Sequence, residues 1–124
     1  MTKKLLILAL VLPGSAYAAE ILDPSFGPDG HGAAVSVERD RHFGTNRLPA
    51  YIFVDGKAVA TLKGGEAVIL RMSPGPHVMG SSLRNPPTAP DKAMAVEATE
   101  GKTTMLKAHL GNWGWTGMEL QRVE

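Results

Sequence analysis

A run of short apolar segments separated by turns constrains this chain more than any other feature. It occupies residues 49–79, with the sequence PAYIFVDGKAVATLKGGEAVILRMSPGPHVM. Asp55-Gly56 between β-forming residues predicts a type I′ hairpin, because both central residues of that turn need positive φ. Later glycines and prolines predict further chain reversals, so the segment is predicted to form a β-meander. The residues predicted to have structural roles in turns are Asp55, Gly56, Gly65, Pro74, Gly75 and Gly101.

Alternating apolar and polar residues extend the β pattern over most of the chain. Val35 and Val37, for example, alternate with Ser36 and Glu38, the period of a half-buried strand. About eight short strands separated by regular turn signals predict an all-β domain, either a β-sandwich or a small barrel. The predicted strands cover residues 33–38, 50–54, 57–62, 66–72, 77–83, 92–99, 102–110 and 115–123.

The first 18 residues have the pattern of a secretory signal peptide. Two lysines precede an apolar run at residues 5–12, and Ala16-Tyr17-Ala18 offers the small residues of a cleavage site. The apolar run is too short for a membrane span. We therefore predict cleavage after Ala18 and a periplasmic or secreted protein. Residues 19–32 are predicted to be a flexible N-terminal arm, and residues 33–124 the folded domain.

Composition excludes several classes of site. The chain has no cysteine, which rules out disulfides, thiolate metal sites, cysteine nucleophiles and a lipid-modified cysteine. Removal of the signal peptide leaves eleven basic and twelve acidic residues, a net charge of −1. A nearly neutral domain without a basic cluster argues against a nucleic-acid partner.

The turn residues and their order resemble those of PEGA-like β-sandwich domains. They consist of Asp55-Gly56-Lys57 between two apolar strands, Pro74-Gly75-Pro76-His77 before another strand, and Glu100-Gly101-Lys102 before a late strand. The resemblance is closest to an uncharacterised family (a domain of unknown function) found in bacterial envelope proteins and small lipoproteins. It implies a single immunoglobulin-like or prealbumin-like β-sandwich of about seven or eight short antiparallel strands, with a binding or scaffolding role at the cell envelope.

The sequence contains no pattern that predicts catalytic, cofactor-binding or metal-binding residues, and no cofactor is predicted. The four histidines lack the local spacing of a metal site. His77 follows a turn, where its ring can hydrogen-bond a turn carbonyl, and this structural role is favoured. A small periplasmic hydrolase or metal-dependent enzyme that uses His77 or His109 is the alternative. It requires histidines and a carboxylate to converge in one cleft.

Two segments are candidates for a binding surface. Trp113 and Trp115 lie two residues apart among glycines, so on an extended chain they would point to one face and could stack on a sugar or a partner side chain. Burial in the core is favoured for at least one of them. The other candidate is the polar connection with Arg39, Arg41, His42 and Arg47, which could bind carboxylate or phosphate groups.

These observations predict an exported, non-enzymatic envelope protein that binds a protein or a glycan. A structural envelope component that oligomerises through exposed strand edges is a further alternative.

Overall fold

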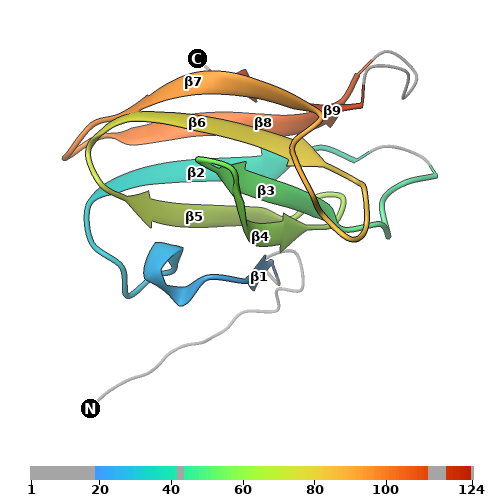
Figure 1. Cartoon of the computed structure of the whole chain (residues 1–124), viewed down its shortest axis with the longest axis horizontal. Coiled ribbons are helices and arrows are strands. Elements are labelled where there is room, and N and C mark those ends of the chain that lie inside the picture. Colours follow the sequence, from blue (N-terminus) through green and yellow to red (C-terminus); the bar gives the residue numbers. More distant parts are fainter. Residues whose placement is uncertain (1–18, 42–43, 112–116, 124) are drawn as a thin grey trace.

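The structure, a computed structural model, describes residues 19–41, 44–111 and 117–123. These residues form two packed β-sheets and one short 3-10 helix (Figure 1), which confirms the predicted all-β sandwich. The predicted signal peptide and the start of the last predicted strand lie outside the described residues. The elements are β1 (Glu20–Ile21), η3 (Pro24–Phe26), β2 (Ala33–Arg39), β3 (Ala50–Val54), β4 (Lys57–Leu62), β5 (Ala67–Met72), β6 (Gly75–Ser82), β7 (Lys92–Ala98), β8 (Thr103–Leu110) and β9 (Met118–Arg122).

One sheet has the strand order β1-β4-β3-β6-β7, and the other has the order β5-β2-β8-β9. All strand pairs are antiparallel except β2 and β8, which run parallel and depart from the purely antiparallel expectation. The turn after β7 carries the chain to the second sheet, where β8 is placed beside β2 in the same direction. Alternation within each strand specifies which residues face the core, but it does not specify the direction of a neighbouring strand.

The core lies between the two sheets and follows the predicted alternation. Val35 and Val37 are fully buried, whereas the residues between and after them, Ser36 and Glu38, are more exposed. Burying a side chain of this size contributes about 1.5–3 kcal/mol to folding. The largest apolar side chains that are completely buried are Phe53, Ile52, Leu62, Leu70, Met79, Leu106, Met118, Val35, Val37, Val54 and Val59.

The predicted hairpin is present at Asp55-Gly56. Both residues have positive φ, 51° at Asp55 and 88° at Gly56, as a type I′ turn requires. The flanking strands β3 and β4 have the predicted bounds. The local turn chemistry was therefore sufficient to locate this pair of strands.

β6 begins at Gly75, two residues earlier than predicted, and includes Pro76. The Val78 C=O accepts from the Asp55 N–H, on the β3 side of β6. Because backbone polar groups alternate in direction along a strand, the nitrogen of Pro76 points to that same side. β3 pairs with β6 only from Met79 onward, so the missing N–H of Pro76 leaves no gap in a ladder.

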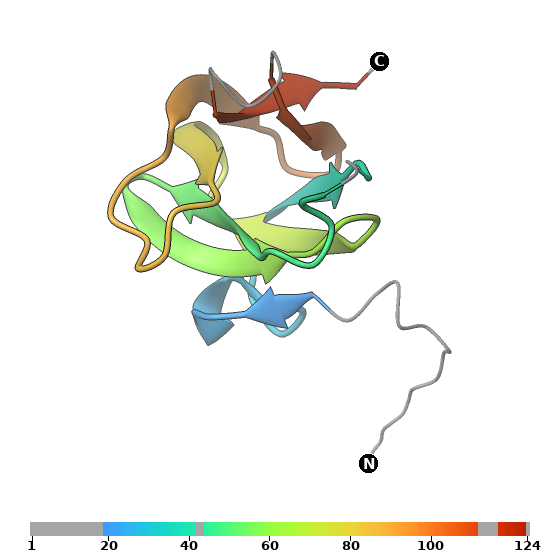
Figure 2. The same ribbon diagram turned by 90° about the vertical axis from the view of Figure 1, so that its right-hand side faces the viewer.

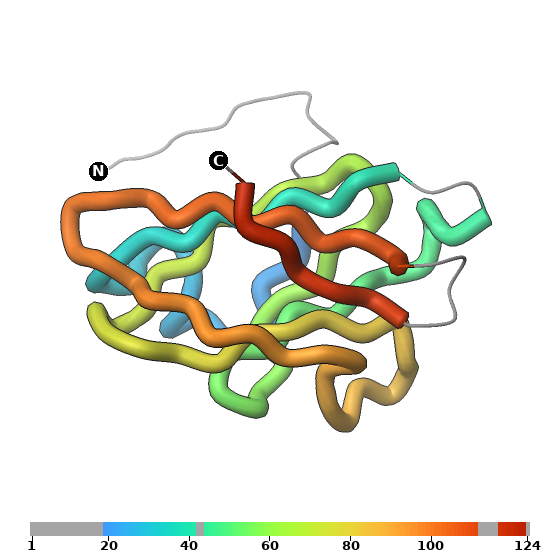
Figure 3. The backbone as a smooth tube through the Cα atoms, turned by 90° about the horizontal axis from the view of Figure 1, so that it is seen from above, coloured from blue at the N-terminus to red at the C-terminus, as the bar shows by residue number. Residues whose placement is uncertain are grey.

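The two sides of the sandwich differ. On one side β9 packs against β6 and β7, and in the view from above it starts between β7 and β8 (Figure 3). On the other side lie β5 and the N-terminal segment, which forms β1 and η3 beneath the sandwich (Figure 2). β1 pairs with β4, and Ile21 and Phe26 pack against the core. Among the described residues, no helix is long and apolar enough to cross a membrane.

Candidate functional site

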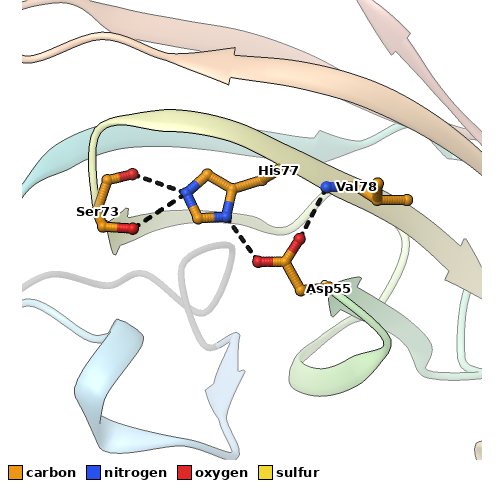
Figure 4. A network of polar contacts seen from close by, with 4 residues as sticks. All are labelled: Asp55, Ser73, His77 and Val78. Carbon is orange, nitrogen blue, oxygen red and sulfur yellow. Dashed lines mark hydrogen bonds and ion pairs between the residues drawn. The ribbon is translucent and has the colours of Figure 1, made fainter.

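Asp55, Ser73, His77 and Val78 form a polar network that joins two turns (Figure 4). The Asp55 carboxylate accepts from the Val78 N–H at 2.9 Å and lies 2.7 Å from Nδ1 of His77. The other ring nitrogen, Nε2, lies 2.7 Å from the Ser73 carbonyl oxygen. The His77 side chain is only 10% exposed. The ring therefore links the turn before β6 to the β3–β4 hairpin.

The partners of the His77 ring determine its protonation. A carboxylate and a carbonyl oxygen can only accept hydrogen bonds, so the two contacts are satisfied together only when both ring nitrogens donate, which is the imidazolium form. Burial of the ring opposes this charge, but the hydrogen bonds to Ser73 and Asp55 outweigh burial and raise the pKa of His77. The Val78 N–H and then the His77 ring lower the pKa of Asp55.

The network contains the residue types of a Ser-His-Asp triad, and Ser73 Oγ lies 3.4 Å from His77 Nε2. A triad histidine acts as a general base through a ring nitrogen with a free lone pair. Here Nε2 donates its proton to the Ser73 carbonyl, so it cannot take a proton from Ser73 Oγ. This geometry favours a structural clamp between two turns.

The clamp should make stability depend on pH. A raised folded-state pKa means that His77 stabilises the protein below about pH 6.5 and that this contribution is lost as pH rises through the folded pKa. We expect His77→Gln to lower the free energy of unfolding more at pH 6 than at pH 9, as measured by urea denaturation. The exposed His31, changed to Gln, is the control and should show no such difference. An equal loss for His77→Gln at both pH values would contradict the charged clamp.

His109 contacts a different carboxylate, since its Nδ1 lies 3.2 Å from Asp40 Oδ2. His77 lies near the start of β6 and His109 near the end of β8, and these lie at opposite ends of the sandwich (Figure 1). The described residues contain no group of three or more His, Cys, Asp or Glu side chains placed to hold a metal ion. The structure thus offers no shared cleft for an enzyme that uses both histidines.

Arg39, expected on an exposed binding surface, is instead buried with 1% exposure. Its position continues the core face of β2 by one residue beyond the predicted strand end. The guanidinium donates to the carbonyl oxygens of Leu62 at 2.9 Å and Thr45 at 2.8 Å, and also to that of Leu48. Arg39 therefore holds the loop after β2 against β4 and cannot face a ligand.

The structure describes only two of the other residues predicted to form a binding surface. Arg41 and Arg47 are exposed, and the Arg41 guanidinium lies over Gly65. Three other candidates, His42, Trp113 and Trp115, lie outside the described residues, and their predicted binding role stays a prediction.

An open groove of about 530 Å³ lies between the N-terminal segment and β5. One wall comes from β5 and β2, and the other from the segment around β1 and η3. Its lining is mainly apolar, with one positive charge. We call it the β5 groove, and its lining residues are Ala19, Ile21, Pro28, Ser36, Ala67, Val68, Ile69 and Arg71.

The wall formed by β5 is an unpaired strand edge among the described residues. β5 pairs with β2 on one side, and the Arg39 N–H donates to the Glu66 carbonyl across that side. Backbone groups alternate along an antiparallel strand, so the N–H and C=O groups of Ala67, Ile69 and Arg71 point away from β2. They therefore point toward the groove that these residues line.

Exposed apolar side chains also lie on the outer face of the second sheet, beside the groove. Ser36 pairs with Ile69 on one side and with Met105 on the other, and the Val123 N–H donates to the Met105 carbonyl. Three of these side chains are large, apolar and exposed: Ile69 at 54%, Met105 at 51% and Val123 at 42%. Ser36 separates Ile69 from Met105, so these side chains add apolar surface near the groove without forming a continuous patch.

No family model, curated protein or solved structure matches this chain.

The residues of the β5 groove were not among the candidates from sequence. In the strand predicted at residues 66–72, alternation places Ala67, Ile69 and Arg71 on the face opposite Leu70, and the burial of β5 agrees with this. The available signal was Ile69 itself, a large apolar residue on the face opposite Leu70. The location of the groove also depends on residues 19–28, which are distant in sequence and carry no periodic pattern.

Proposed function

We propose that this protein is an exported, non-enzymatic domain of the bacterial envelope that binds another protein through the β5 groove. The single observation that carries the proposal is the apolar groove beside an unpaired strand edge. The signal peptide pattern and the resemblance to PEGA-like domains support the location and the class of protein. Neither depends on the groove.

The chemistry of the groove favours a protein partner over a glycan. Only Ser36 and Arg71 among its lining residues carry polar side chains, and none of the lining residues is aromatic. A sugar has many hydroxyl groups that need hydrogen-bond partners when buried. An apolar groove with a single charge is better suited to an apolar protein segment.

A second candidate function is self-assembly into an envelope component. The same unpaired edge of β5 supports it, because exposed edges can pair with an edge of another copy. Light scattering on the purified protein distinguishes a monomer from an assembly.

Photocrosslinking tests the proposed binding function. A benzoylphenylalanine at position 69 should form a discrete adduct with an envelope protein in living cells, identified by mass spectrometry, because Ile69 lines the β5 groove. Position 48 is the matched control, since Leu48 is 50% exposed and lies outside the groove. Equal adduct yields at the two positions, or no adduct at position 69, would contradict a partner in the groove.

A further inference from the structure

We propose that the partner contributes an extended segment that pairs with β5 as an additional antiparallel strand, and that its core is an acidic residue followed by two apolar residues. This inference rests on the proposed function and specifies how the β5 groove is used. It follows from the backbone of β5, from the volume of the groove and from the side chains that line it.

The backbone of β5 can accept a further strand. Ala67, Ile69 and Arg71 direct their N–H and C=O groups away from β2, and no backbone hydrogen bond to a described residue outside the strand ladders involves them. Pairing with an extended segment would satisfy these groups in the manner of β-augmentation. Affinity from main-chain bonds would then be combined with selection by the side chains of the segment.

The volume of the groove fits one short extended segment. A strand residue occupies about 160 Å³, given roughly 4.8 Å between strands, 10 Å between sheets and 3.3 Å along the strand. The groove of about 530 Å³ therefore accommodates about three residues. In a pairing of β5 with β5 of a second copy, each copy would also bring its own N-terminal segment to the same narrow site. A single peptide segment is thus the better occupant.

The side chains that line the groove determine which residue types the three positions of the partner's segment favour. Opposite residues of an antiparallel pair share a face of the sheet. The residues opposite Arg71 and Ile69 therefore lie on the outer face, and the residue between them points inward toward Val68 and Ile21. These positions favour, in order along the segment, an acidic residue, an inward apolar residue and an outward apolar residue.

Arg71 supplies the charge for the acidic position. Its guanidinium makes a long contact of 3.4 Å with the Gly32 carbonyl, and it has no carboxylate partner among the described residues. An incoming carboxylate can form a charge-assisted hydrogen bond with this guanidinium.

Synthetic peptides test the inference on protein purified after export from cells that express the full chain. The probe is a fluorescein-labelled peptide Lys-Thr-Glu-Val-Val-Thr-Lys with capped ends, and binding is measured by fluorescence anisotropy. Saturable binding is expected, together with NMR shift changes centred on residues 67–71. N-methylation of the second valine removes the N–H that would donate to Ile69 and should weaken binding roughly tenfold. The peptide with the order Val-Val-Glu should also bind more weakly.

Variants of the protein test whether Arg71 and Ile69 make the proposed contacts with the peptide. Replacing Glu by Gln in the peptide should weaken binding to the wild type roughly fivefold, and Arg71→Gln should abolish that difference. Ile69→Glu should weaken binding of the original peptide, whereas the matched Leu48→Glu should not. Melting curves of all variants check that each remains folded, and Arg71→Gln preserves the test if Ile69→Glu does not fold.

The outcomes separate this inference from the proposed function. A crosslink at position 69 without peptide binding would overturn strand addition and leave a protein partner in the groove. Equal affinity of the N-methylated peptide would also overturn strand addition, because side-chain contacts alone would then suffice. Self-association abolished by Ile69→Glu would assign the edge to a second copy and overturn the inference. Absence of both the crosslink and peptide binding would overturn both proposals.

Discussion

Replacing Arg39 with methionine should lower the free energy of unfolding by about 3–5 kcal/mol. The guanidinium is buried and donates to the carbonyl oxygens of Leu48, Leu62 and Thr45. Methionine fills a similar length but donates nothing, so three charge-assisted hydrogen bonds are lost. The bond to the Leu62 carbonyl is buried, and losing the donor there costs about 1–3 kcal/mol. Burial lowers the pKa of Arg39 from a very high starting value, and arginine keeps its charge in proteins. Urea denaturation measures the loss.

Arg47→Met is the matched control for this experiment, because Arg47 is exposed on the same connection. It should change the free energy of unfolding by no more than about 0.5 kcal/mol. Arg39→Lys should lower the free energy of unfolding by an amount between those of Arg39→Met and Arg47→Met. A lysine keeps the charge but lacks the planar guanidinium that reaches several acceptors. A loss below about 1 kcal/mol for Arg39→Met would show that the loop finds other donors for its carbonyls.

The sequence predicted those parts of the fold that depend on neighbours along the chain. Asp55-Gly56 determined the bounds of β3 and β4 because the turn chemistry and the flanking apolar runs agree. Alternation identified the core face of β2, including Val35 and Val37. In both cases the physical cause acts over a few residues and is visible in the order of the side chains.

The features that sequence reasoning missed depend on contacts between distant segments. Alternation from Val35 and Val37 already placed Arg39 on the core face, but burial of an arginine requires carbonyl groups from loops that the pattern does not place. Asp55 and His77 meet because the hairpin turn and the start of β6 lie side by side. The β5 groove likewise requires the N-terminal segment to lie against β5. Local periodicity contains none of this information.

The His77 clamp and the β5 groove use different side chains, so their roles can be tested with different variants. The clamp joins the β3–β4 turn to the start of β6, whereas the groove uses the edge of β5 and the N-terminal segment. A change at His77 should therefore alter stability without altering selection by Arg71.

Gly80→Val should lower the free energy of unfolding by about 3 kcal/mol, the upper part of the range for overpacking. Gly80 lies in β6 between Phe53 of β3 and Ala93 of β7. A Cβ added there would collide with the Lys92 carbonyl oxygen and with the Pro90 ring. The Lys92 carbonyl belongs to the backbone of a paired strand, so it cannot move aside without disturbing the ladder between β6 and β7. Gly80 therefore lies where the backbone of β7 closely approaches β6.

The control for Gly80→Val is Ala95→Val on the neighbouring strand. Ala95 is exposed and pairs with Val78, so a β-branched residue there should change the free energy of unfolding by no more than about 0.5 kcal/mol. Gly80→Ala should already show most of the loss, because the collision involves the Cβ atom itself. Urea denaturation of the three variants beside the wild type measures these differences. An unchanged midpoint for Gly80→Ala would contradict the close packing around Gly80, since the methyl group fits only if both Pro90 and the Lys92 carbonyl are displaced.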